Sequence, residues 1–334
     1  MADAKKPKVA GAAPTPHLAG AHRYEKQELL GSGTFGDVFL ALDLERARQR
    51  VAVKRIKPPG KFVDGVSWTA LREVKILREV SHAHVVNLLD VFVHNDVVSL
   101  VFEFCAFDLD RVIRDGERVL LEGEIVSYVL MLLRGLEALH AVWVLHRDLK
   151  PSNLLINDAG VLKIGDFGLA RVFAAQDGAD RVGEMTSQVV TLFYRAPELL
   201  FGAKDYGVGV DMWAVGCIFA ELLIRIPFFP GSSEIDQLGR IFHALGTPSE
   251  QDWPGVVDLP SYMAFNRVEP VPLATHFPRA SPRAVALLSA LFTFDPARRP
   301  SATQALAHEY FTAPDAVKPV PCDALPKPSG LKVR

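Results

Sequence analysis

The sequence has few cysteines, no excess of charge of either sign and no long uninterrupted apolar run. Only three of its 334 residues are cysteines, at positions 105, 217 and 322, and their spacing is not that of metal ligands. They indicate reduced thiols in a cytosolic or nuclear protein. Because the net charge is only −2, we expect neither direct binding of nucleic acid nor association with a membrane surface.

The longest apolar segments, residues 126–133 and 212–224, are interrupted or bounded by charged residues. They are typical of buried helices and not of membrane spans. Residues 1–21 lack a continuous apolar core, so we expect no signal peptide. The composition, 49% hydrophobic and 23% charged, is that of a soluble globular protein, and the length favours two lobes that share a cleft. We expect a soluble protein of the nucleus, the cytoplasm or both.

A polar cluster between apolar residues, within the segment 144–155, is the first candidate for a catalytic site. Its residues include His146, Arg147, Asp148, Lys150 and Asn153. Phosphoryl transfer to a hydroxyl needs a carboxylate beside the nucleophile, a cation near the γ-phosphate and an oxygen ligand for Mg²⁺. Asp148, Lys150 and Asn153 offer these three groups. The spacing matches the catalytic-loop pattern H-R-D-L-x-x-x-N.

Glycines at 31, 33 and 36 predict a tight turn between two strands. Glycines let backbone amides approach phosphate oxygens. Dinucleotide-binding oxidoreductases use the same G-x-G-x-x-G pattern, but there it opens a helix. Here it leads into the strand-like residues 38–42, and no acidic residue closes a second strand at the expected distance. The sequence therefore favours a phosphate-binding hairpin.

Lys54 and Glu73 are predicted to form an ion pair. Residues 51–56 alternate as a strand does and place Lys54 on one face. Residues 67–80 have the apolar spacing of a helix, with Glu73 beside the apolar stripe. A buried carboxylate there is costly unless it is paired. The alternatives are a solvated lysine at a sheet edge and a surface pair of Glu73 with Lys57 or Lys75.

Asp166-Phe167-Gly168 follows the polar cluster and suggests a second Mg²⁺ ligand. We expect Asp166 and Asn153 to hold the ion. Further on, we expect Asp211 to cap backbone amides of the catalytic loop. We also expect Arg299 to pair with Glu198, which ends the segment 166–198.

Thr186 is a candidate phosphorylation site. Arg72, Arg147 and Arg171 all stand beside or inside the motifs above, and three guanidinium groups that converge without an acid would repel one another. A phosphate on Thr186 would neutralise them and order the segment. The alternative is three independent surface arginines.

Over residues 24–311 these motifs resemble the eukaryotic protein kinases, and within them the cyclin-dependent kinases. The resemblance implies an α+β fold with two lobes: an N-lobe (24–102) with a small antiparallel sheet and one main helix, a hinge (103–108) and a larger, mostly helical C-lobe (109–311). A disordered basic tail (1–22) would precede the domain, and a tail rich in proline and lysine (312–334) would follow it.

The resemblance also implies ATP and Mg²⁺ as cofactors and a Ser/Thr acceptor, to which Lys150 and Thr191 beside Asp148 are suited. Backbone groups of Glu103 and Cys105 would hold adenine, and Phe102 would close the pocket behind it. The implied ATP-binding set is Leu30, Gly31, Ser32, Gly33, Thr34, Phe35, Gly36, Asp37, Val38, Ala52, Lys54, Glu73, Phe102, Glu103, Cys105, Asp108, Leu155 and Asp166.

Within the cyclin-dependent kinases the chain is most similar to the CDK-activating kinases. Residues 67–73, 198–203 and 206–223 are similar to the corresponding segments of these kinases. In the wider cyclin-dependent kinase family, residues 69–73 resemble the cyclin-contacting helix and residues 189–198 the substrate-binding stretch, with Phe193 where Trp is usual. This implies an H-type cyclin, a third assembly factor, and a pocket for the proline after the target residue formed by Val189, Val190 and Arg195. Implied substrates are other cyclin-dependent kinases and the RNA polymerase II tail.

Two alternatives stay open. Residues 170–173 are similar to the corresponding residues of the cell-cycle-related kinase, which would act without an H-type cyclin. A kinase-fold scaffold without catalysis is disfavoured, because Lys54, Asp148, Asn153 and Asp166 are all present.

Overall fold

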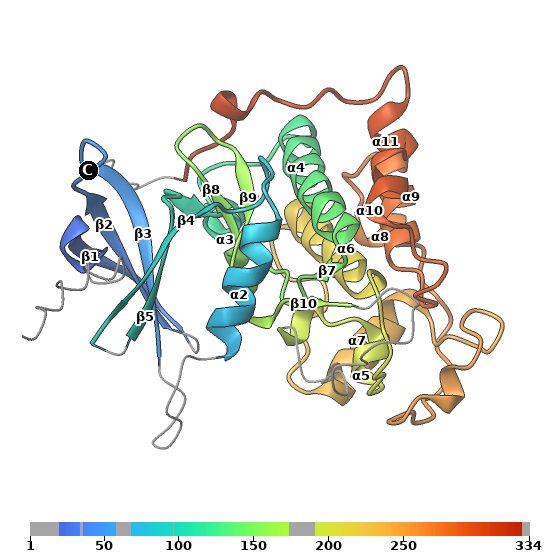
Figure 1. Cartoon of the computed structure of the whole chain (residues 1–334). Helices are drawn as coiled ribbons and strands as arrows, with labels where there is room; N and C mark the ends of the chain where they lie inside the picture. Colours follow the sequence, from blue (N-terminus) through green and yellow to red (C-terminus); the bar gives the residue numbers. More distant parts are fainter. Residues whose placement is uncertain (1–19, 34–35, 58–67, 96, 174–190, 329–334) are drawn as a thin grey trace, which may run out of the picture. The chain divides into compact units, whose positions relative to one another are not determined.

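The computed structural model describes residues 20–33, 36–57, 68–95, 97–173 and 191–328 (Figure 1). The chain divides into two compact units, which we describe separately. The sheet unit comprises Met1–Val74 and Leu88–Phe104, and the helical unit comprises Lys75–Asn87 and Cys105–Arg334. The division falls within the expected hinge, between Phe104 and Cys105. Of the described helices, none is both long and apolar enough to cross a membrane.

The sheet unit is built on an antiparallel sheet of five strands in the order β1-β2-β3-β5-β4. The strands are β1 (Tyr24–Ser32), β2 (Gly36–Asp43), β3 (Gln49–Ile56), β4 (Leu88–His94) and β5 (Val97–Glu103). Successive side chains of β3 point to opposite faces of the sheet. Val51 and Val53 are buried on one face, on which Arg55 stays exposed, and Lys54 and Ile56 are buried on the other. Tyr24 of β1 stacks on Phe92 of β4, with ring centroids 5.6 Å apart.

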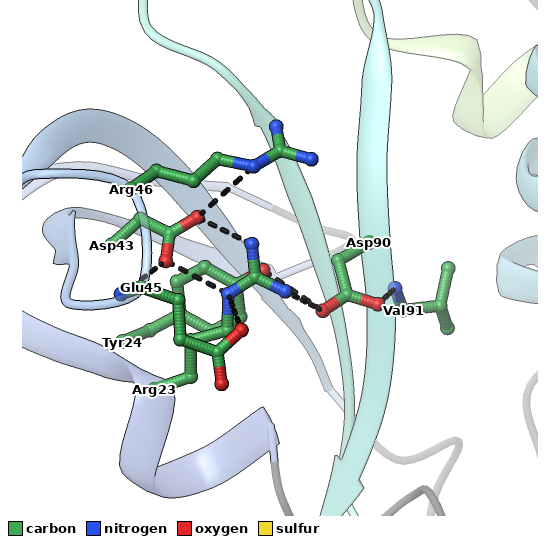
Figure 2. A network of polar contacts seen from close by, with 7 residues as sticks. All are labelled: Arg23, Tyr24, Asp43, Glu45, Arg46, Asp90 and Val91. Carbon is green, nitrogen blue, oxygen red and sulfur yellow. Dashed lines mark hydrogen bonds and ion pairs between the residues drawn. The ribbon is translucent and has the colours of Figure 1, made fainter.

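Arg23 joins the start of β1 to the end of β2 and to β4 (Figure 2). It is the last residue of a single helical turn, α1 (Gly20–Arg23). Its guanidinium donates to both oxygens of Asp43, at 2.8 and 2.6 Å, and lies 3.7 Å from Asp90, which accepts from the Tyr24 hydroxyl at 2.8 Å. The hydrogen bond from Arg23 lowers the pKa of Asp43. The sequence placed residues up to 22 in a disordered tail; of these, 20–22 lie in α1, and Arg23 belongs to the folded unit.

The main helix of the expected N-lobe is α2 (Trp68–Glu79). It starts in the sheet unit, and its last residues are grouped with the helical unit. Glu73 is only 2% exposed, as its place beside the apolar stripe predicted.

The helical unit is organised around two long helices, α4 (Glu122–Ala141) and α6 (Gly209–Ile224). Around them lie shorter helices: α3 (Leu109–Arg114), α5 (Pro197–Leu200), α7 (Glu234–Leu245), α8 (Leu273–His276), α9 (Pro282–Leu291), α10 (Ala302–Leu306) and α11 (Glu309–Thr312). Almost every side chain of α6 is buried, as expected for a helix that is apolar all round.

Short strands of the helical unit carry the catalytic segments. In one sheet β8 (Leu154–Ile156) lies between β6 (Phe107–Asp108) and β9 (Leu162–Ile164). In the other, β7 (Val144–Leu145) pairs with β10 (Arg171–Val172). The helical unit also contains short 3-10 turns: η1 (Pro151–Asn153), η2 (Phe167–Leu169), η3 (Leu192–Tyr194), η4 (Val256–Asp258) and η5 (Cys322–Ala324).

Glu198 and Arg299 form the buried ion pair that the sequence predicted. The two carboxylate oxygens accept from the guanidinium at 2.8 and 3.1 Å, and both side chains are at most 3% exposed. Arg299 also lies over the Trp213 ring, 5.0 Å from its centroid. The pair therefore ties α5 to the loop that precedes α10 and to the core of α6.

The segment after α11 lies against the helical unit as far as Pro328. Figure 1 shows it in red, running from α11 towards the turn between β8 and β9. The sequence predicted only a tail from residue 312 onward. The segment is rich in proline, and its apolar residues follow neither the helix nor the strand period. Its packing as an extended segment could therefore not be predicted from the sequence.

Candidate active site

Asp148 lies at the centre of a cluster of hydrogen-bond donors. Lys150 Nζ donates to Asp148 Oδ2 at 2.9 Å, and Asn153 Nδ2 donates to the same oxygen at 3.0 Å. The Thr191 backbone amide and hydroxyl both donate to Oδ1, at 3.2 Å. Lys150 Nζ also reaches the Thr191 hydroxyl at 3.1 Å. The four residues that we predicted as catalytic are thus brought together, and the carboxylate of Asp148 is fixed in orientation.

The carboxylate of Asp211 holds the backbone of the catalytic loop through hydrogen bonds. Its two carboxylate oxygens accept from the amides of His146 and Arg147, at 3.0 and 2.9 Å, as the sequence predicted. His140 Nε2 lies 3.0 Å from the same carboxylate. These contacts lower the pKa of this fully buried carboxyl group against the opposing effect of burial. Arg147 needs this support because its φ of 64° is left-handed.

Asn153 precedes β8 and Asp166 follows β9, so both stand at the open end of the β8–β9 hairpin. Leu154 pairs with Ile164, and one step beyond, the Gly165 amide donates to Asn153 O at 2.9 Å. His146 Nε2 lies 2.9 Å from Gly165 O, and its ring packs edge-on against Phe167. The hairpin therefore sets the separation of the two expected Mg²⁺ ligands.

The donor chemistry of these two residues fits Mg²⁺. Both offer side-chain oxygens, which this ion prefers, and Mg²⁺ usually takes one or two carboxylates and completes its shell with waters and phosphates. No group of three or more His, Cys, Asp or Glu side chains placed to hold a metal occurs in the described residues.

In the sheet unit, the predicted Lys54–Glu73 ion pair is present. Lys54 Nζ donates to both carboxylate oxygens, at 3.0 and 3.1 Å, and both side chains are almost fully buried. In β3, Lys54 faces Val38 of β2 and Leu100 of β5 in register. The alternative of a solvated lysine at a sheet edge is therefore wrong.

The glycine turn has the predicted strand–turn–strand form, with Leu30 and Gly31 on β1 and Gly36 to Val38 on β2. Gly36 is required by packing, because an added Cβ would lie 2.2 Å from Arg55 O. Ser32 donates to Asp37 at 2.6 Å, and Lys57 lies 3.2 Å from the same carboxylate. Both contacts, that from Ser32 more strongly, lower the pKa of Asp37.

The residues expected around adenine divide between the units. Phe102 is buried and Glu103 is half-buried in the sheet unit, while Cys105 opens the helical unit. Asp108 also has a local role, since its side chain caps α3 by accepting from the Arg111 amide at 2.9 Å. Ala52 and Leu155 are half-buried.

Several expected site residues lie outside the described residues: Thr34, Phe35, Thr186, Val189 and Val190. Of the expected phosphate-binding arginines, Arg147 donates to Leu169 O at 2.9 Å and to the Tyr206 hydroxyl at 2.8 Å. Arg171 lies in β10, and Arg72 lies in α2 in the other unit. Arg195 pairs with Glu234 at 2.5 Å.

Tyr194 is a residue that the sequence analysis missed. It is the last residue of η3, whose N-cap is Thr191. Its hydroxyl donates to Glu221 of α6 at 2.7 Å. Burial raises the pKa of Glu221, and the Tyr194 hydrogen bond partly counteracts this. The only available signal was an acidic residue in an otherwise apolar helix, which asks for a buried partner.

Comparison with known proteins then decides the family. The family described as protein kinase domain matches residues 24–311. The chain belongs to the protein kinase family. It is 51% identical over 311 residues to cyclin-dependent kinase 7 of Xenopus laevis, covering 92% of this chain and 86% of that protein. It is 44% identical over 309 residues to serine/threonine-protein kinase crk1 of Schizosaccharomyces pombe, covering 92% and 89%.

Among solved structures, this kinase is similar to a chain of the CAK complex of Chaetomium thermophilum bound to ATP-γ-S. The TM-score is 0.84 and the identity 39%, over 94% of this chain and 99% of that chain. The protein is thus a Ser/Thr protein kinase of the cyclin-dependent kinase group. Like other protein kinases, it uses ATP with Mg²⁺, and the ion neutralises charge on the phosphates during transfer.

Proposed function

We propose that this kinase is a CDK-activating kinase that works with an H-type cyclin and a third assembly factor. The observation that carries the proposal is the similarity to cyclin-dependent kinase 7 across 92% of the chain. The similarity to a chain of a solved CAK complex supports it. Its substrates are the activation loops of other cyclin-dependent kinases and the Ser-Pro repeats of the RNA polymerase II tail, which places it in the nucleus.

In the proposed reaction, Asp148 orients the acceptor hydroxyl and takes its proton. A positioned base of this kind contributes about 10²–10⁴ in rate. Four donors already fix the Asp148 carboxylate, so little reorganisation is needed when substrate binds. Lys150 stabilises negative charge near the γ-phosphate, and Asn153 and Asp166 bind Mg²⁺.

In the sheet unit, Lys54 binds the α- and β-phosphates and is kept in place by Glu73. The cyclin acts on α2, which carries Glu73, and favours the state in which this pair is formed. Phosphorylation of Thr186 adds a second level of control through Arg72, Arg147 and Arg171. Val189, Val190 and Arg195 accept the proline that follows the target residue.

The test is transfer of radiolabelled phosphate from ATP by the purified chain, with and without an H-type cyclin. The acceptors are an RNA polymerase II tail peptide and a cyclin-dependent kinase whose activation-loop Thr is intact. We expect cyclin-dependent labelling of both acceptors, and its loss in Asp148→Asn. The matched control Asp258→Asn changes an exposed carboxylate of the same unit and should retain activity.

Two outcomes would contradict the proposal. Equal labelling with and without cyclin would favour a role like that of the cell-cycle-related kinase. Labelling of neither acceptor, while a general Ser/Thr-Pro peptide is labelled, would show that the substrate class is wrong although the enzyme is active.

A further inference from the structure

The C-terminal strap, residues 317–328, contacts the turn that joins β8 to β9. Cys322 O lies so close to Gly160 that an added Cβ there would be 1.8 Å away. Lys327 Nζ donates to Asp158 O at 3.3 Å. Cys322 Sγ lies 3.8 Å from Met131 Sδ. Met131 Sδ in turn accepts a hydrogen bond from the Leu162 amide at 3.3 Å. The strap therefore contacts the turn directly and also, through Met131, the first residue of β9.

The strap is anchored along α4 by specific hydrogen bonds and by burial. The Ser127 hydroxyl lies 2.9 Å from Val320 O, and the Val320 amide donates to Gly123 O at 3.3 Å. The Tyr128 hydroxyl donates to Pro326 O at 3.4 Å, and Leu325 is only 4% exposed. These are the contacts of a bound extended peptide, with backbone hydrogen bonds along its length and buried side chains near its end.

Two glycines of the helical unit fit the strap closely. A Cβ on Gly123 would lie 2.9 Å from Lys318 O. Gly160 has both a left-handed φ of 77° and the close approach to Cys322. Any larger residue at 160 would have to push the strap away from the turn.

The other end of the same hairpin holds the expected Mg²⁺ ligands. Residues 157–161 close β8 and β9, and at the open end the Gly165 amide bonds to Asn153 O, next to Asp166. The strands are only three residues long, so a shift of the turn is transmitted to the open end over a short distance.

We propose that the C-terminal strap is a positioning device for the Mg²⁺ site: by holding the 157–161 turn, it fixes the β8–β9 hairpin and thereby the spacing of Asn153 and Asp166. Residues outside a metal's direct ligands that orient them commonly contribute about 10–100-fold in metal affinity. The inference rests on the kinase activity and not on the CDK-activating role.

The experiment measures the Mg²⁺ concentration that gives half-maximal binding of a fluorescent ATP analogue, with no cyclin or acceptor present. Three chains are compared with the full-length protein: one ending at Ala316, Gly160→Ala and Gly255→Ala. Gly255 has the same φ of 77°, but an added Cβ there meets nothing nearer than 3.8 Å. It therefore reproduces the backbone strain of the Gly160 variant without the clash.

We expect the Mg²⁺ requirement to rise about tenfold in the shortened chain and in Gly160→Ala. It should stay unchanged in Gly255→Ala. A synthetic peptide of residues 317–328 added to the shortened chain should restore the original requirement, and a Leu325→Asp peptide should not. Hydrogen exchange of residues 157–161 should report the same loss and recovery without reference to activity.

If the shortened chain keeps the Mg²⁺ requirement of the full-length protein, the strap only covers apolar surface and the inference is wrong. A purely stabilising strap would lower the melting temperature and leave the Mg²⁺ requirement unchanged. If Gly160→Ala does not fold, the shortened chain with its two peptides decides alone. Because no cyclin or acceptor is used, failure of the proposed function would leave this result untouched.

Discussion

Thr191 shows how much of the catalytic geometry depends on one hydroxyl. It donates to Asp148 and accepts from Lys150, so Thr191→Val, which has the same shape, removes both interactions. A hydrogen bond to a charged group is worth about 1.5–3 kcal/mol, so we expect kcat to fall about 10–100-fold. Thr191→Ser keeps the hydroxyl and should stay within about threefold.

The measurement is steady-state phosphorylation of a Ser-Pro peptide, with the affinity for ATP determined separately. ATP affinity should be the same in both variants, because Thr191 acts through Asp148. Equal kcat values for the valine and serine variants would show that the backbone amide of Thr191 is sufficient to hold the carboxylate.

At the scale of elements, Tyr194 ties η3 to α6 through Glu221, which is 1% exposed. We expect Tyr194→Phe to lower the free energy of unfolding by about 1–3 kcal/mol, because a buried carboxylate loses its partner. Tyr310→Phe is the matched control: the Tyr310 hydroxyl is buried with no hydrogen-bond partner in the described structure. Its removal should be neutral or slightly stabilising.

The same pair predicts a pH dependence. The pKa of Glu221 is raised above its usual 4.5 by burial and is held down in part by Tyr194. Between the unfolded and folded pKa the native state binds more protons, so stability falls as pH rises through this window. Tyr194→Phe should raise this pKa further and extend the fall to higher pH. Denaturant midpoints measured from pH 4 to 8 will test this, and parallel curves for Tyr194→Phe and the parent protein would contradict it.

At the scale of the whole molecule, the two units should respond separately to damage in one of them. Arg23 is bonded to the buried Asp43 (Figure 2), so Arg23→Ala should destabilise the sheet unit by about 2–3 kcal/mol. Hydrogen exchange should quicken in β1, β2 and β4 and stay unchanged in α4 and α6. Arg48→Ala removes an exposed pair with Glu25 and should cost less than about 1 kcal/mol.

This prediction also has a definite pH limit. The depressed pKa of Asp43 means that the pair stabilises the unit above the unfolded pKa, and that this contribution disappears as the pH falls through the folded value. The difference between Arg23→Ala and the parent protein should therefore shrink below about pH 4. A difference that is independent of pH would assign the effect to packing of the arginine instead.

The contacts that the sequence predicted are those whose partners belong to motifs with fixed spacing. The Lys54–Glu73 pair, the Asp211 cap and the Glu198–Arg299 pair are all present. Each joins charged residues that would be costly to bury alone, so charge together with an apolar setting was a sufficient signal.

The contacts that the sequence did not predict have no such signal. Arg23 stands directly after a segment rich in alanine, proline and glycine, and nothing local marks it as folded. The C-terminal strap is held in large part through its backbone carbonyl groups, which leave no periodic pattern in the sequence. Gly160 and Gly123 show why such packing stays hidden, because their small size matters only once the strap is in place.

The Glu198–Arg299 pair also limits how this protein can change over generations. Replacing either residue alone leaves a buried charge without its partner, at about 3–5 kcal/mol, against a total stability of about 5–15 kcal/mol for a typical domain. A lineage can therefore exchange the pair only by altering both codons together or after a stabilising change elsewhere. Glu198 and Arg299, although 101 positions apart in the sequence, are therefore expected to be kept or replaced together.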